Sequence, residues 1–309
     1  MGTRRHAIPA TRRELLAAAL ALSGTWAFRV PRARADSRLR VVASFSILAD
    51  FVANVGADRV DLETLVGPDS DAHVYTPSPA DALRVRGAKV VFVNGLGFEG
   101  WMPRLIKASG GAAAIAVATN GIKPRRMPDA HDHGAIDPHA WQSVANAKIY
   151  IGNIRDALLG VDPSSSAAYR AAAEDYLTKL GALEEEVREA VERVPPEHRK
   201  VITTHDAFGY FADAYGIAFI APQGVSTEAQ PSAREVARII DQIRRRRIPA
   251  VFLENISDPR LLERIATETG AKIGGTLYSD ALTRPTGEAP TYIAMMRHNI
   301  RVLIQALTS

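Results

Sequence analysis

Cysteine is absent from this chain of 309 residues. Without thiols the protein has neither a disulfide framework nor a metal site built on thiolate ligands. Its stability must therefore come from a buried hydrophobic core, which a chain of this length is able to form. If the protein binds a metal, it must do so with histidine and carboxylate side chains, and eight histidines are present.

A long hydrophobic run is also missing, because the apolar stretch at residues 17–24 is far shorter than the ~20 residues that span a membrane. It follows the paired arginines Arg12 and Arg13 and precedes an A-x-A cleavage pattern that ends at Ala35. These features are typical of a secretory signal, here of the twin-arginine type. We expect cleavage after Ala35 to remove residues 1–35. Since no cysteine is available for a lipid anchor, we expect a periplasmic protein in a cell with an outer membrane.

The excess of basic charge disappears once this signal is removed. The full chain has a formal net charge of +4 and a pI of about 9.4. Residues 1–35 hold seven arginines and a single acid, Glu14, so the remaining chain has 31 basic and 33 acidic side chains and a net charge of −2. The basic pI belongs to the targeting segment, and nucleic acid is therefore not expected as a partner.

Strand-like and helix-like segments alternate in the first part of the mature chain and again in the last part, which predicts parallel sheets flanked by helices. Between them, apolar residues recur every three or four positions from Tyr169 to Val194, which indicates a helix of about 30 residues and ~45 Å. We therefore predict an α/β fold of two lobes, each a mostly parallel sheet flanked by helices, joined by one long rigid linker helix. The predicted boundaries are 36–163 for the N-terminal lobe, 164–196 for the linker helix and 197–309 for the C-terminal lobe.

Three histidines and one aspartate each lie just beyond a predicted strand: His73, His139, His205 and Asp280. In open α/β sheets, ligands collect beyond the carboxyl ends of the strands. Two of the four fall in each lobe, so they are able to converge in a cleft between the lobes. Three imidazoles and a carboxylate would complete the coordination of an ion such as Zn²⁺. Taken singly, each is equally explained as a surface or core residue, and Asp280 as a helix N-cap. A further histidine, His298, is expected at the surface of the last helix.

Six motifs carry a resemblance to a known family: VVASFSILADFV, GPDSDAHVYTPSPAD, DPHAW, TTHDAFGYFADAYG, STEAQPSAREV and TLYSDAL. With these motifs the mature chain resembles the zinc- and manganese-binding solute-binding proteins of ABC transporters, of the ZnuA/TroA/AztC type (cluster A-I). The resemblance implies two lobes bridged by a rigid helix and a metal in the cleft between them. It places the metal ligands at His73, His139, His205 and Asp280. It also implies a membrane permease as partner.

Position 205 bears on the choice of metal. Manganese-preferring proteins of the resembled family usually have a glutamate there, whereas this chain has His205. Imidazole is a softer ligand than carboxylate, and zinc exceeds manganese in intrinsic affinity. We therefore expect a protein that captures Zn²⁺ and delivers it to an ABC permease for import, with a manganese-binding transport protein of the same family as the alternative. We expect a monomer, and the sequence does not decide whether a periplasmic zinc chaperone loads the site.

A second candidate site lies in the loop at residues 119–138, which is rich in Pro, Gly and Asp. His131 and His133 resemble the His-rich loops of zinc-binding relatives and are interpreted as a weak secondary zinc site, with Asp129 and Asp132 as further oxygen ligands. A solvated loop explains the same composition equally well.

The sequence indicates a binding protein rather than an enzyme. Four protein ligands would fill a tetrahedron, whereas a catalytic zinc keeps an open position beside a general base. The glycine-rich stretch NGLGFEGW lacks the lysine of a phosphate-binding loop. A zinc-dependent hydrolase is the alternative from another class, with Asp280 or Asp206 as the base. A surface adhesin or a metal sensor of the same fold is a third alternative.

Overall fold

The computed structural model describes residues 1–2, 38–127, 135–228, 231–246, 248 and 250–308. The predicted signal, its cleavage site at Ala35 and the loop histidines His131 and His133 lie outside these residues. Across the described ranges, no helix is both long enough and apolar enough to cross a membrane.

The first sheet is parallel throughout and has the strand order β2-β1-β3-β4. Its strands are β1 (Leu39–Phe45), β2 (Val60–Val66), β3 (Val90–Val93) and β4 (Ala114–Val117). Strand β1 is buried from Val41 to Phe45, as expected for a central parallel strand that is covered on both faces. The helices of this half are α2 (Ser46–Gly56), α3 (Pro79–Gly87), α4 (Met102–Ser109) and α5 (Val144–Val161). Short 3₁₀ turns η1 (Ala57–Arg59) and η2 (Ala140–Gln142) complete it.

The second sheet repeats this arrangement with the parallel order β6-β5-β7-β8. Its strands are β5 (Lys200–Ile202), β6 (Ala218–Ile220), β7 (Ala250–Glu254) and β8 (Lys272–Leu277). Its helices are α7 (Gly209–Tyr215), α8 (Ala233–Arg246), α9 (Arg260–Thr269) and α10 (Tyr292–Leu307). The predicted fold class is thus confirmed, while the residue limits predicted for the lobes stay predictions.

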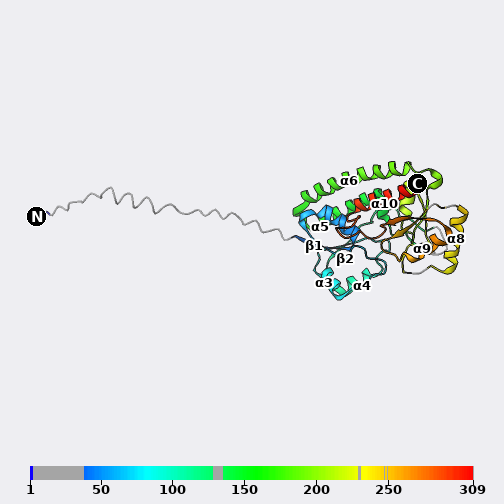
Figure 1. Ribbon diagram of the computed structural model, residues 1–309. Coiled ribbons are helices and arrows are strands. Elements are labelled where there is room, and N and C mark those ends of the chain that lie inside the picture. Colours follow the sequence, from blue (N-terminus) through cyan, green and yellow to red (C-terminus); the bar gives the residue numbers. More distant parts are fainter. Residues whose placement is uncertain (3–37, 128–134, 229–230, 247, 249, 309) are drawn as a thin grey trace. The chain divides into compact units, whose positions relative to one another are not determined.

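A single long helix, α6 (Ser166–Glu192), follows the 3₁₀ turn η3 (Pro163–Ser165) and ends before η4 (Pro196–His198). It packs against α2, α5 and α10, and Figure 1 shows α3 and α4 on the other side of the first sheet. The apolar residues that predicted this helix are buried, among them Tyr169, Leu180 and Leu183. Its 27 residues correspond to about 40 Å.

One hydrophobic core extends from the first sheet through α5, α6 and α10 to residues of the second sheet such as Phe252 and Leu277. A separate, smaller core lies under α8 and α9, with Ile243, Val251 and Leu262 among its members. The α8–α9 layer is therefore joined to the rest of the molecule by the second sheet and by polar contacts, more than by the main core.

The expectation that His298 lies at the surface was wrong. Its side chain is 6% exposed, and its Nε2 lies 3.0 Å from the carbonyl oxygen of Thr276 on β8. The neighbouring Arg297 suggested an exposed face, but α10 packs this side of the helix onto the second sheet.

Candidate metal centre

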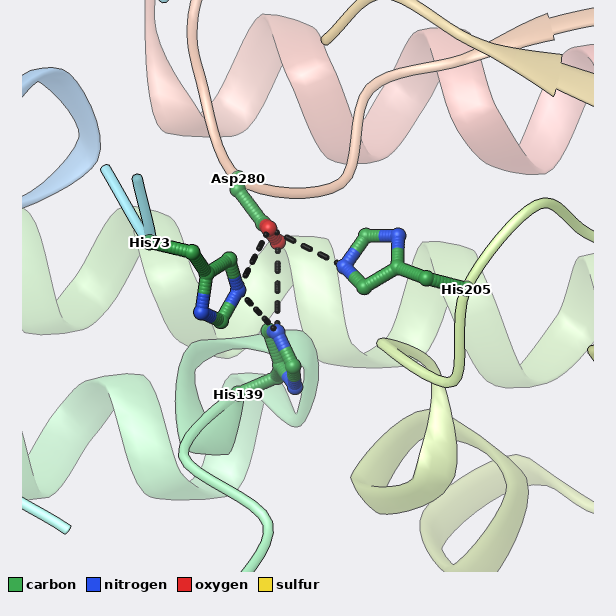
Figure 2. A group of neighbouring side chains, drawn as sticks. All are labelled: His73, His139, His205 and Asp280. Carbon is green, nitrogen blue, oxygen red and sulfur yellow. Dashed lines mark hydrogen bonds and ion pairs between the residues drawn. The ribbon is translucent and has the colours of Figure 1, made fainter. Parts of the chain in front are cut away.

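The four residues predicted from the sequence meet at one point. One ligand atom from each of His73, His139, His205 and Asp280 lies within 4.8 Å of every other. Figure 2 shows the four side chains turned toward one another from four separate segments of the chain. The structure thus brings together all four, although they are spread over more than 200 positions of the sequence.

Three of the four residues follow a parallel strand in the sequence, as expected for a ligand site in this type of sheet, and the segment of His139 is tied to the end of β3 by the Asn94 Nδ2–H, which donates to the carbonyl oxygen of Pro138 at 2.9 Å. His205 comes shortly after β5 and Asp280 shortly after β8. His73 lies between β2 and α3, in a segment fixed by the Trp101 Nε1–H, which donates to the carbonyl oxygen of Ala72 at 2.8 Å. His139 directly precedes η2.

The Asp280 loop belongs to the second sheet but is held by the first half of the chain. The Trp141 Nε1–H and the Gln142 Nε2–H both donate to the carbonyl oxygen of Ser279, at 2.9 and 2.7 Å. The Leu282 N–H donates to the Ser46 hydroxyl oxygen at 3.0 Å. Since Trp141 and Gln142 stand two and three residues after His139, in η2, the loop of Asp280 is anchored to the segment of His139. Two ligands thus come from each half of the chain, and the loop that carries Asp280 is also hydrogen-bonded to the first half.

Two of the three imidazoles contact a carboxylate through Nδ1, the ring nitrogen that points away from the centre. The His139 Nδ1 lies 2.8 Å from Asp137 Oδ1, and the His205 Nδ1 lies 2.6 Å from Glu254 Oε2. A carboxylate at Nδ1 holds the proton there and leaves the Nε2 lone pair directed at the centre, which is the arrangement of metal-binding histidines.

These two carboxylates are themselves held in place. Arg125 Nη1 lies 3.3 Å from Asp137 Oδ2. Glu254 Oε1 accepts the backbone N–H groups of Thr204 and His205, at 2.7 and 3.0 Å. The sequence reasoning missed both carboxylates. Two signals were available: Asp137 stands two residues before a predicted ligand, and Glu254 ends strand β7 at the edge where the ligands gather.

His73 differs from the other two histidines. Its side chain is 5% exposed, whereas those of His139 and His205 are fully buried. Among the residues that the structure describes, no carboxylate pairs with its Nδ1. Its backbone N–H donates to Asp71 Oδ1 at 2.8 Å, and its ring packs edge-on against Phe98 at 4.7 Å. His73 is thus the ligand with the most exposed side chain, and its imidazole is fixed by fewer contacts than those of His139 and His205.

The carboxylates change the basicity of the two buried imidazoles. Burial alone would lower the pKa of His139, but Asp280 and Asp137 outweigh it and raise that pKa to about 9. Burial also opposes the charge on His205, and here Glu254 and Asp280 raise the pKa well above its usual value. Both imidazoles therefore hold protons tightly without a cation, and a metal must displace those protons.

The remaining two groups shift in the opposite direction. Burial lowers the pKa of His73, and its hydrogen bond to Asp280 does not compensate. Burial would raise the pKa of Asp280, but His139 and His205 lower it well below its usual value. The carboxylate is thus ionised and His73 is neutral at neutral pH, which are the forms that bind a metal.

The donor set fits a small divalent cation. In a tetrahedron with metal–ligand bonds of 2.0–2.1 Å, neighbouring ligand atoms are about 3.3 Å apart. His73 Nε2 lies 3.2 Å from both His139 Nε2 and Asp280 Oδ2. Asp280 Oδ2 also lies 3.0 Å from His205 Nε2, and the other oxygen, Oδ1, lies 3.6 Å from His139 Nε2. The buried Asp280 Oδ1 has no hydrogen-bond donor within the described part of the chain. A cation at the centre would satisfy that oxygen.

The sequence profile of the family described as zinc-uptake complex component A, periplasmic (ZnuA) matches residues 41–306. The chain belongs to this family. ZnuA-family proteins are metal-binding, substrate-binding components of ABC transporters, and they are transport proteins rather than enzymes. A membrane permease is therefore the partner that the family implies.

Three relatives of this ZnuA-family chain carry names with three different metals. The iron-binding protein YfeA of Yersinia pestis is 34% identical over 263 residues, which cover 85% of this chain and 84% of that protein. The manganese-binding lipoprotein MntA of Halalkalibacterium halodurans is 32% identical and covers 87% and 89%. The structure of the periplasmic zinc-binding protein TroA from Treponema pallidum superimposes with a TM-score of 0.83 at 29% identity, covering 88% of this chain and 99% of that chain. The relatives thus support a divalent metal without selecting one.

The proposed secondary site at His131 and His133 falls outside the described residues and stays a prediction. The chain on either side of it forms a short ribbon, in which the Met127 N–H donates to the carbonyl oxygen of Ala135 at 3.0 Å. The Asp137 N–H then donates to the carbonyl oxygen of Arg125 at 2.9 Å. The base of this ribbon therefore holds the carboxylate that orients His139.

Proposed function

We propose that this protein captures Zn²⁺ with His73, His139, His205 and Asp280 and delivers it to an ABC permease for import. The observation that supports this most is the cluster of three imidazoles and one carboxylate, whose ligand atoms all lie within 4.8 Å of one another, three of the pairs at 3.0–3.2 Å. The ion is the cargo of the protein, and no bond chemistry accompanies its binding.

The preference for zinc rests on His205. Its imidazole is fully buried and fixed by Glu254, so the site offers a third nitrogen where a carboxylate would offer a harder oxygen. Zinc also exceeds manganese and ferrous iron in intrinsic affinity for such donors. Manganese is the second candidate, because Asp280 supplies an oxygen ligand and a relative as similar as MntA is named for manganese.

The test is metal content after purification from cells supplied with both zinc and manganese. The proposal expects about one equivalent of zinc per chain, since four ligands build one site. His205→Glu should shift the bound metal toward manganese, whereas His198→Glu, at a histidine outside the centre, should not. Manganese as the main metal of the wild-type protein would contradict the choice of zinc while leaving the transport role in place.

We further propose that the mature protein starts after Ala35 and acts in the periplasm as a monomer, with lobes at 36–163 and 197–309 joined by 164–196. In a strain that lacks its own copy, His73→Ala should fail to restore growth at low zinc. An adhesin of the same fold would keep its function in that variant, so restored function would argue against transport.

A further inference from the structure

A cavity of about 470 Å³ is lined by residues from both halves of the chain. Asp71 lines it from the first half, and every other lining residue comes from the second half, including Thr204, Thr227, Ser257 and Asp258. The lining holds two carboxylates and three hydroxyl groups, together with Gln223, two apolar residues and Arg260, whose guanidinium pairs with Asp258. Asp71 is therefore the carboxylate of the lining that has no arginine partner among the described residues. Oxygen donors of this kind suit a divalent cation that still carries its water.

Two residues of the lining adjoin candidate ligands along the chain. Thr204 immediately precedes His205, and Asp71 stands two residues before His73. Glu254, which holds His205, leads directly into the wall segment that contains Ser257. The cavity is thus one residue away from a ligand of the second half and two residues away from a ligand of the first half.

Hydrogen bonds cross from one half to the other here, two of them at Asp69, where the Asn255 Nδ2–H donates to Oδ1 at 3.3 Å and the Asp69 N–H donates to the carbonyl oxygen of Leu282 at 2.9 Å. A further one reaches Asp71 at the cavity itself. The Thr227 hydroxyl donates to Asp71 Oδ2 at 2.5 Å. The other oxygen of the same carboxylate, Oδ1, accepts the backbone N–H of His73 at 2.8 Å. Asp71 therefore connects the backbone of the most exposed ligand to the opposite half of the molecule.

The ligand whose backbone Asp71 contacts, His73, is also the one least fixed by neighbouring side chains. Of the four candidate ligands, His73 is the one whose side chain keeps some exposed surface. Of the three histidine ligands, it is the one with no carboxylate at Nδ1 among the described residues. The wall opposite Asp71 leads from β7 into α9, which packs on the small separate core. Its α9 residues Leu262, Ile265 and Ala266 belong to that small core, whereas β7 contributes to both cores.

Given the proposed capture of a divalent cation, on which this step depends, we propose that the cavity is the route by which the ion enters and leaves. The Thr227–Asp71 hydrogen bond is the latch that sets the rate of exchange. Asp71 and Thr227 affect the rate of ion exchange through the hydrogen bond between them, and neither residue is a ligand of the bound ion.

The latch is tested with Thr227→Val, which removes the hydroxyl, keeps the side-chain shape and leaves the Oδ1 contact to His73 intact. Zinc uptake and zinc transfer to a chelator are followed by stopped flow. Breaking a hydrogen bond to a charged acceptor should raise the rate of release about tenfold. Thr227→Ser should bring the rate back toward the wild-type value, and Thr178→Val, on the exposed face of α6, serves as the matched control.

The route is tested by blocking the cavity. Because the chain has no cysteine, a single cysteine in Asp258→Cys, at an exposed residue of the lining outside the latch, can be labelled alone with a bulky maleimide. The label should slow both uptake and release at least tenfold relative to the same label on Thr178→Cys. Melting temperature and zinc stoichiometry of each variant are measured in parallel, so a loss of folding is recognised separately.

Two results would overturn the inference. If Thr227→Val releases zinc at a rate within twofold of the wild-type rate, the Thr227–Asp71 hydrogen bond does not control exchange. Exchange in the labelled Asp258→Cys protein that is as fast as, or faster than, in the labelled control would rule out the cavity as the route. Tight zinc binding by the wild-type protein in the same assay tests the proposed function on its own, so an unchanged rate in the variants bears on this inference alone.

Discussion

Glu254 and Asp137 set the orientation and the basicity of the two buried histidines, His205 and His139. Each carboxylate lies within 2.8 Å of an imidazole Nδ1, and each is itself held by backbone or guanidinium groups. Such partners fix the ring orientation and raise the basicity of the metal-binding nitrogen. The centre is therefore built from six side chains, of which four point at the ion.

Glu254→Gln should weaken zinc binding by about 10- to 100-fold, because the neutral amide lowers the basicity of His205 and no longer fixes its tautomer. The measurement is competition with a chelator of known affinity. Glu263→Gln, in the exposed first turn of α9, provides the matched control. An affinity of the Glu254 variant within twofold of that control would show that the carboxylate does not act through His205.

Zinc binding should release protons at neutral pH. The pKa of His139 is raised to about 9 and that of His205 is raised well above its usual value, so both imidazoles are protonated in the metal-free protein at pH 7. Because the metal binds the deprotonated form, affinity should fall as pH decreases from 9 to 6, by about tenfold per pH unit for each proton displaced.

Calorimetry in buffers of different ionisation enthalpy measures this proton release directly. Between one and two protons per zinc are expected at pH 7, where unperturbed imidazoles with a pKa near 6.5 would release far fewer. Release of no protons, together with an affinity that is constant from pH 7 to 9, would contradict the raised pKa values of the centre.

The sequence was sufficient to find the four candidate ligands, because each follows a strand and the family motifs surround them. It was not sufficient for Glu254, since its contact with His205 depends on the pairing of β5 with β7. It was misleading for His298, whose burial depends on the packing of α10 against β8.

Among the elements, α6 was the most predictable, because its three- and four-residue spacing of apolar residues is a local property of the sequence. The anchoring of the Asp280 loop to η2 was not predictable, because it depends on hydrogen bonds from Trp141 and Gln142 to a residue more than 130 positions away. Local periodicity defines a helix, whereas contacts between loops arise only from the assembled fold.

Truncation of a buried residue of α6 should destabilise the whole molecule. Leu183 is fully buried in the main core, so Leu183→Ala should lower the free energy of unfolding by about 2–5 kcal/mol. Chemical denaturation of the metal-free protein measures this, with the exposed Lys179→Ala on the same helix as control. Equal stabilities of the two variants would mean that α6 does not pack as described.

At the scale of the whole molecule, the two sheets share one strand order, β2-β1-β3-β4 and β6-β5-β7-β8. The alternation of strands and helices predicted two parallel α/β lobes, but no internal sequence repeat revealed this common order. Similar topology without similar sequence is expected where only the pattern of buried and exposed positions is needed to form the fold. The ligands gather where the carboxyl ends of strands from both sheets meet.

The central claim is that His73, His139, His205 and Asp280 together hold one divalent ion. Anomalous scattering at the zinc edge from crystals of the zinc-loaded protein tests it most directly. The account predicts one strong peak bonded to the Nε2 atoms of the three histidines and to an oxygen of Asp280, at about 2.0–2.2 Å. A main peak elsewhere, or a peak that lacks any one of these four residues as a ligand, would contradict it.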